Sequence, residues 1–118
     1  MGTFAVSIQV GDLASQQFIQ VEALVDTGST YTVLPGSALI GLGVEPAEQA
    51  LFELADDRLV EYPVGDARIR LEGRERIAPV VFGPEGATPL LGSVTLEIFR
   101  LAVDPVHRRL VPVPALLK

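Results

Sequence analysis

The sequence contains no cysteine and only one histidine, His107. Without cysteine there can be no disulfide framework, no thiolate metal site and no thiol nucleophile. A single histidine also excludes a histidine-rich zinc site, and it leaves His107 as the sole base for a serine triad. We expect His107 to be an exposed hairpin residue, because it stands beside a predicted turn. Carboxylates remain as a common means of hydrolysis, and we expect neither a metal nor another cofactor.

The sequence is also short of basic residues and of long apolar runs. Nine basic residues face fifteen acidic ones, and the net charge of -6 provides no general attraction to nucleic acid or anionic lipid. No stretch approaches the roughly 18 apolar residues of a membrane-spanning helix, and residues 1–7 lack the pattern of a secretion signal. We therefore expect a soluble, cytoplasmic protein with no nucleic-acid and no membrane partner.

Short apolar runs, separated by eleven glycines and nine prolines, dominate what the sequence does contain. This spacing is typical of the all-β (mainly β) class, and the length fits one domain, 1–118. The predicted strands are 4–10, 18–25, 51–54, 59–63, 67–71, 77–82, 101–103 and 110–113. Two short helices are predicted at 37–42 and 93–99, the second capped by Ser93.

One predicted strand ends in polar residues where its apolar pattern indicates burial. Residues 18–25 lead into Asp26-Thr27-Gly28, which brings together a carboxylate, a hydroxyl and a glycine. Buried polar groups need hydrogen-bond partners. In an Asx turn, the Asp26 side chain would accept a hydrogen bond from the backbone amide two residues later. A calcium loop is excluded because too few oxygen ligands follow and the twelfth position is not acidic. The triplet alone leaves open both a simple turn and a functional carboxylate.

The residues around the triplet carry a family resemblance. Residues 29–35 follow it, and much later Leu90-Leu91-Gly92 precedes a predicted helix. This order resembles the retropepsin-like (retroviral-type) aspartic peptidases, including their small bacterial members, over nearly the whole chain. The resemblance implies an acid protease half-barrel with one or two short helices. It also implies a homodimer that cleaves a peptide or protein substrate.

The resemblance further implies roles for particular residues. Asp26 is the expected catalytic carboxylate, Thr27 the brace between two active-site loops across the dimer, and Gly28 a contact to the substrate backbone. The substrate pockets are expected at Tyr31, Val33, Thr88 and Leu90. The flap, a hairpin that closes over substrate, is expected at Leu54, Ala55, Asp56, Asp57 and Arg58. Because the chain has one such triplet, the second carboxylate must come from another copy.

The sequence departs from the retroviral pattern in three places. Retroviral enzymes pair an Asp after the triplet with an Arg after the late glycine, but those places hold Thr30 and Ser93. The flap tip is acidic rather than glycine-rich, so it is either a solvated turn or a filter for charged substrates. The tail, 101–118, is longer and richer in proline. Two alternatives stay open: a catalytically silent peptide-binding or dimerisation module, and a structural β-domain of a larger assembly.

Overall fold

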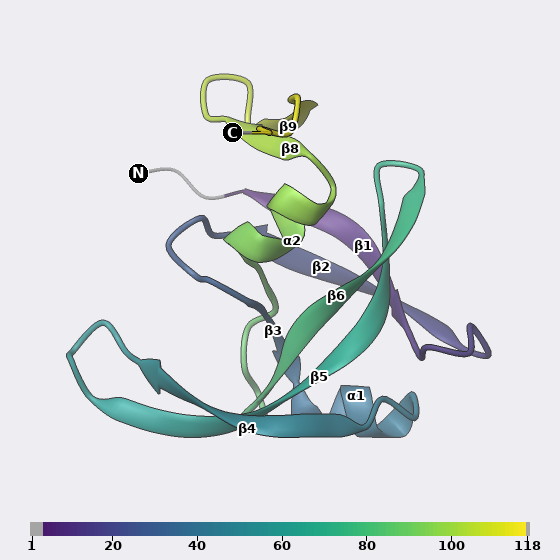
Figure 1. Cartoon of the computed structure of the whole chain (residues 1–118), viewed down its shortest axis with the longest axis vertical. Coiled ribbons are helices and arrows are strands. Elements are labelled where there is room, and N and C mark those ends of the chain that lie inside the picture. The colour runs from purple at the N-terminus through teal and green to yellow at the C-terminus, as the bar shows by residue number, and fades with distance from the viewer. Residues whose placement is uncertain (1–3, 118) are drawn as a thin grey trace.

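The computed structural model describes residues 4–117, which form two β-sheets and two short helices (Figure 1). The larger sheet has seven strands in the order β1-β2-β7-β3-β6-β5-β4, and β1 pairs with β5 as well. Its strands are β1 (Ala5–Gly11), β2 (Phe18–Val25), β3 (Thr32–Pro35), β4 (Pro46–Glu53), β5 (Leu59–Leu71), β6 (Arg74–Gly83) and β7 (Leu90–Leu91). The helices are α1 (Gly36–Gly41) and α2 (Ser93–Ile98), and the small sheet is a hairpin of β8 (Leu101–Asp104) and β9 (Arg109–Pro112).

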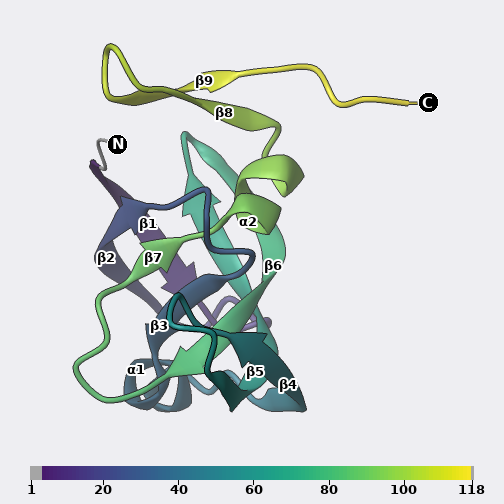
Figure 2. The ribbon, with the colours of Figure 1, turned by 90° about the vertical axis from the view of Figure 1, so that its left-hand side faces the viewer.

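The additional pairing of β1 with β5 turns the large sheet back on itself around a hydrophobic core. Ile8, Val10 and Ile69 are almost fully buried on the facing strands β1 and β5. Burial of a large aliphatic side chain stabilises the fold by about 1.5–3 kcal/mol. The helix α2 adds Leu96, and the hairpin β8–β9 lies beyond α2 at one end of the molecule (Figure 2). Among the described residues, β4 alone of the large sheet's strands contributes nothing to this core.

The long strand β5 belongs to two antiparallel hairpins. Its first part pairs with β4 from Leu59 to Gly65, and its later part pairs with β6 from Val64 to Leu71. From Leu59 to Pro63 the side chains are exposed or half-buried, whereas from Ala67 to Leu71 buried side chains alternate with exposed or half-buried ones. One end of β5 is therefore part of the core, and the other projects from it with β4.

The prediction of a mainly β fold with two short helices is confirmed. Three details of the prediction are wrong. The separate strands predicted at 59–63 and 67–71 are one strand, β5, and the short strands β3 and β7 were not predicted. Ser93 does not cap α2, because Gly92 is the N-cap and no side chain bonds there; the Ser93 hydroxyl instead lies 3.5 Å from the Thr30 carbonyl. No helix within 4–117 is long and apolar enough to span a membrane.

Candidate active site

Strand β2 delivers Asp26 to the end of the sheet. The parallel pairing of β2 with β7 places Val25 beside Leu91, and both side chains are buried. One residue later, the Asp26 amide donates to the Leu91 carbonyl at 3.0 Å. Asp26 directly follows the buried Val25, and it is half-buried. The strand pairing therefore fixes its backbone, and its side chain is partly accessible to solvent.

The triplet forms a tight turn around the Asp26 side chain. The Gly28 amide donates to Asp26 Oδ1 at 2.9 Å, and the Ser29 amide donates to the Asp26 carbonyl at 3.1 Å. The Asx turn considered from the sequence is thus present, and it uses one carboxylate oxygen. Within residues 4–117, no hydrogen bond is made by Asp26 Oδ2 or by the exposed Thr27 hydroxyl. Both groups remain accessible at the surface.

A second segment lies across the turn and holds it. The Ser93 amide donates to the Ser29 carbonyl at 2.8 Å, and the Val94 amide donates to the Thr30 carbonyl at 2.9 Å. Gly92 packs so closely that an added Cβ would lie 2.5 Å from the Tyr31 backbone. Only glycine fits there without a shift of one segment. Leu90-Leu91-Gly92 and the triplet, recognised separately in the sequence, are therefore in direct contact.

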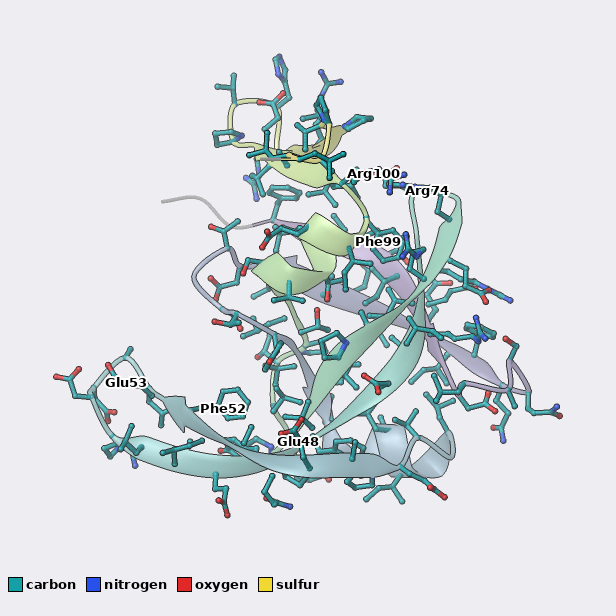
Figure 3. All side chains as sticks on the ribbon, viewed as in Figure 1. Glu48, Phe52, Glu53, Arg74, Phe99 and Arg100 are labelled. Atoms are coloured by element: carbon teal, nitrogen blue, oxygen red, sulfur yellow. The ribbon has the colours of Figure 1, made fainter. Side chains whose placement is uncertain are left out.

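A groove of about 540 Å³ begins at Gly28 and extends beneath the β4–β5 hairpin. Its aromatic residues form a short series, with the Tyr31 and Phe52 ring centroids 6.0 Å apart and those of Phe52 and Tyr62 6.4 Å apart. Phe52 lies on the inner side of the hairpin, and Glu53 lies nearer the tip (Figure 3). The remaining lining residues are Ser29, Thr30, Val33, Leu51, Glu53, Leu54, Val81, Gly83, Pro84 and Leu90. Within the described chain, Glu53 is the only charged residue among them.

The pocket residues expected from the sequence lie in two different places. Tyr31, Val33 and Leu90 line the groove, and Val33 pairs with Leu90 across β3 and β7. Thr88 is exposed and is not among the residues that line the groove. Phe52 was not among the expected pocket residues, and the available signal was a large aromatic side chain within the predicted strand 51–54.

The residues expected to form the flap lie at the tip of the β4–β5 hairpin. The turn closes through bonds from the Leu54 amide to the Arg58 carbonyl and from the Asp57 amide to the Leu54 carbonyl. Leu54 lines the groove, whereas Ala55 and the residues after it are exposed. Arg58 Nε lies 2.6 Å from Asp56 Oδ2, and this ion pair leaves Asp57 and Glu53 as the unpaired acids of the described tip.

His107 is an exposed residue of the turn between β8 and β9. Its Nδ1 lies 2.8 Å from Asp104 Oδ2, and this hydrogen bond is the main reason why the pKa of Asp104 is below its ordinary value. His107 does not line the groove. Residues 4–117 contain no group of three or more His, Asp or Glu side chains placed to hold a metal ion.

Comparison with known proteins adds evidence from structure but none from sequence. No protein-family model and no curated protein matches the chain. Among solved structures it is similar to EIAV protease in complex with the inhibitor HBY-793, with a TM-score of 0.59 and 17% identity over 83% of this chain and 88% of that one. Simian foamy virus (mac) protease gives a TM-score of 0.54 and 18% identity, over 80% and 94% of the two chains.

The chain therefore has the retropepsin-like fold. The predicted fold class and the family resemblance are confirmed at this level. Lpg0085 of Legionella pneumophila, a protein with unknown function, is also similar, with a TM-score of 0.53 and 15% identity over 87% of this chain and 92% of that one. Since a fold does not fix an activity, the function has to be argued from the residues at the site.

Proposed function

We propose that the chain is one half of an aspartic endopeptidase, whose working site contains the Asp26 carboxylates of two identical chains. The observation that carries the proposal is the position of Asp26. It stands at the end of β2, its backbone is bonded to Leu91, and one carboxylate oxygen is left free beside the groove. A carboxylate oriented in this way on the retropepsin-like fold supports acid–base hydrolysis.

The chemistry follows from the coupling of two close carboxyl groups. At a separation of about 3 Å, the spacing typical of aspartic proteases, both cannot be ionised, and the pair shares one proton. The ionised carboxylate takes a proton from a bound water, which attacks the carbonyl carbon of the peptide bond. The protonated partner donates to the carbonyl oxygen. No covalent enzyme intermediate forms.

The exposed face of the triplet supports a two-fold symmetric dimer. One chain supplies one Asp-Thr-Gly, and the unbonded Thr27 hydroxyl is available to a second chain. In a two-fold contact the same patch meets itself, so Thr27 would face Thr27 and each could bond to the opposite loop. Such mutual contacts would hold the two carboxylates in register.

The groove supports an extended peptide as substrate. Its walls are formed largely by apolar and aromatic side chains, including Tyr31, Val33 and Leu90, which suit bulky hydrophobic residues near the cleaved bond. The β4–β5 hairpin forms one side and would act as the flap, with its tip at Leu54 to Arg58. A bound peptide in extended conformation can pair its backbone with the hairpin.

Replacement of Asp26 by Asn tests the mechanism. Because Asn cannot share the proton, we expect hydrolysis of a peptide library at acid pH to fall at least about a thousandfold, with fold and dimer unchanged. Asp66→Asn is the matched control: Asp66 is an exposed acid on β5 outside the groove, and its replacement should leave activity intact. Excess Asp26→Asn chains mixed with wild-type chains should also inactivate them by forming mixed dimers.

Two outcomes would contradict the proposal. Full activity of Asp26→Asn would exclude the carboxylate mechanism, and constant activity per chain at dilutions where sedimentation shows only monomer would exclude the shared site. Peptide binding by wild-type protein without any cleavage would favour the alternative of a catalytically silent peptide-binding or dimerisation module. A groove lined by apolar and aromatic side chains is compatible with that module as well.

A further inference from the structure

Two threonine hydroxyls meet in the core beneath the candidate site. Thr32 Oγ1 of β3 and Thr95 Oγ1 of α2 lie 2.6 Å apart, and both residues are 0% exposed. Within residues 4–117, Asp12 is the only other buried polar or charged residue. A buried hydroxyl is costly unless it is hydrogen-bonded, and valine would fill the same space without that cost. Packing alone therefore does not explain why threonine, and not valine, stands at both positions.

The explanation lies in the peptide group that joins Leu91 to Gly92. Its N–H, from Gly92, donates to Thr32 Oγ1 at 3.1 Å. Its carbonyl, from Leu91, accepts from the Asp26 amide at 3.0 Å. A peptide group is planar and rigid, so these two bonds fix the orientation of the Leu91–Gly92 peptide plane, which lies between the threonine pair and Asp26. The Thr95 hydroxyl in turn fixes the direction of the Thr32 lone pairs.

We propose that Thr32 and Thr95 are positioning residues, which hold the Asp26 backbone through the Leu91–Gly92 peptide group. They act in the interior, on the same two segments whose outer positions, Thr30 and Ser93, lack an ion pair. The consequence for catalysis rests on the proposed function, but the consequence for the loop does not. A hydroxyl pair suits this place because it is neutral and so brings no buried charge.

Variants of the two threonines should differ in the size of their effects. Thr32→Val removes the acceptor of the Gly92 amide, whereas Thr95→Val removes only the partner that orients that acceptor. Thr95→Ser keeps the hydroxyl and should behave as wild type. For Thr32→Val we expect kcat to fall about ten- to a hundredfold with KM little changed, since a small misplacement of a catalytic group has effects of this size. Thr95→Val should show a smaller fall.

Amide hydrogen exchange of the full-length protein, measured by NMR, supplies a test that does not need activity. In Thr32→Val the Asp26 and Gly92 amides should exchange at least about tenfold faster, while the Ile69 amide of the core keeps its wild-type rate. Ser37→Ala, which removes an exposed hydroxyl from α1, is the matched control and should change none of these rates. If Thr32→Val does not fold, the double variant Thr32→Val, Thr95→Val leaves no unpaired hydroxyl and is read in the same way.

Three results would overturn the inference: unchanged exchange at Asp26 and Gly92, equally faster exchange at all amides, or a Thr95→Ser variant as impaired as Thr95→Val. Equal acceleration would mean that the pair only adds global stability. If wild-type protein proves inactive on every peptide while the local exchange effect is present, the proposed function fails and the positioning role stands.

Discussion

The two hairpins that share β5 differ in how they are held. At the β5–β6 end, Ala67, Ile69 and Leu71 are buried, and β1 pairs alongside. At the β4–β5 end the side chains from Leu59 to Pro63 are exposed or half-buried, and an edge-to-face contact of Phe52 with Tyr31 joins the hairpin to the body. The strand β5 is thus anchored where it pairs with β6 and β1, which we call the anchored end, and weakly held where it pairs with β4, which we call the open end. This arrangement suits a movable cover beside a rigid site.

The two ends also differ in charge. The turn region of β5–β6 carries four arginines, and Arg68 and Arg70 both bond to Glu75. The open end is acidic, and its one arginine, Arg58, is paired with Asp56. Figure 3 shows Glu53 at one end of the molecule and Arg74 and Arg100 near the other. No arginine lines the groove of the described chain.

Truncation of one apolar residue at each end of β5 should give the largest difference. Ile69 is 0% exposed and Leu59 is 59% exposed. Ile69→Ala leaves a cavity in the core and should lower the free energy of unfolding by about 2–5 kcal/mol. Leu59→Ala should change it by no more than about 0.5 kcal/mol. Chemical denaturation of both variants checks this, and similar losses would show that the open end is as firmly packed as the other.

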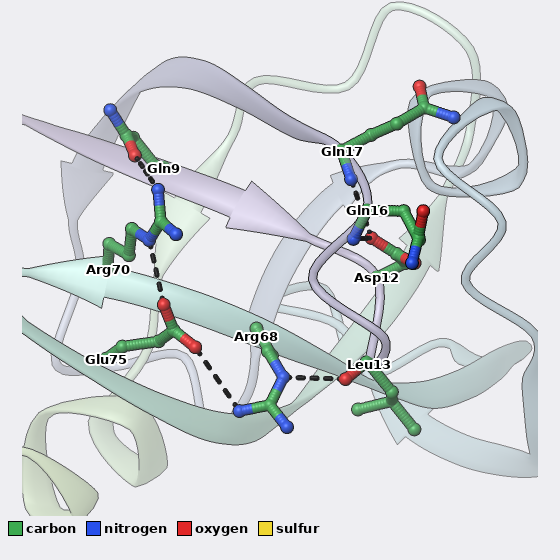
Figure 4. A network of polar contacts seen from close by, with 8 residues as sticks. All are labelled: Gln9, Asp12, Leu13, Gln16, Gln17, Arg68, Arg70 and Glu75. Carbon is green, nitrogen blue, oxygen red and sulfur yellow. Dashed lines mark hydrogen bonds and ion pairs between the residues drawn. The ribbon is translucent and has the colours of Figure 1, made fainter.

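A smaller effect is expected from Asp12, whose loop lies at the anchored end (Figure 4). Asp12 Oδ1 accepts from the Gln16 and Gln17 amides at 2.8 and 3.0 Å, and the bond from Gln17 is the main reason why its pKa lies below the ordinary 3.8. A lowered pKa in the folded state stabilises the protein above the unfolded value, and this contribution is lost as pH falls through the folded value.

The test compares melting temperature against pH in wild type and Asp12→Asn. Wild type should be the more stable at pH 6, and its advantage should shrink below pH of about 4. Gln16→Ala retains the backbone amide and should follow the wild-type curve. A difference between wild type and Asp12→Asn that stayed constant down to pH of about 2 would show that the charge of Asp12 contributes nothing.

The anchored end was more predictable from sequence than the open one. Alternating burial in the later parts of β1 and β2 leaves a period-two pattern that indicates strands directly. Residues 46–49 of β4 are all exposed, so they carry no such pattern, and their pairing with β5 decides their structure. The sequence predicts two strands, 59–63 and 67–71, in place of β5, because Gly65 between them resembles a turn residue. Gly65 is there because an added Cβ would lie 2.4 Å from the Glu45 carbonyl.

The candidate site was predictable only where its signal is local. Asp26-Thr27-Gly28 is contiguous, so its strand-to-turn break is visible in the sequence. The Thr32–Thr95 bond joins residues 63 apart, and nothing in either local pattern indicates it. Thr88, by contrast, was expected at the pocket from the resemblance, but the path from β6 to β7 leaves it exposed outside the groove. Long-range contacts of this kind require the three-dimensional structure.

The smallest expected effect concerns the charge difference between the ends, and it rests on the proposed function. Glu53 is the one charged residue of the described groove, and aromatic rings that attract cations, such as Phe52, lie nearby. Peptides with lysine near the cleaved bond should therefore be cut faster than their glutamate counterparts. In Glu53→Gln this ratio of kcat/KM values should fall about two- to fivefold, as expected for an exposed charge pair.

Glu72→Gln is the matched control, because it removes the same charge from the turn at the other end of β5. Its effect on the lysine-to-glutamate ratio should be negligible. Added salt should reduce the preference of wild type and leave that of Glu53→Gln nearly unchanged, since salt screens exposed charges beyond about 10 Å at 0.1 M. An equal fall of the ratio in both variants would mean that the net charge of the protein, and not the position of Glu53, selects the substrate. The acidic tip would then be only a solvated turn.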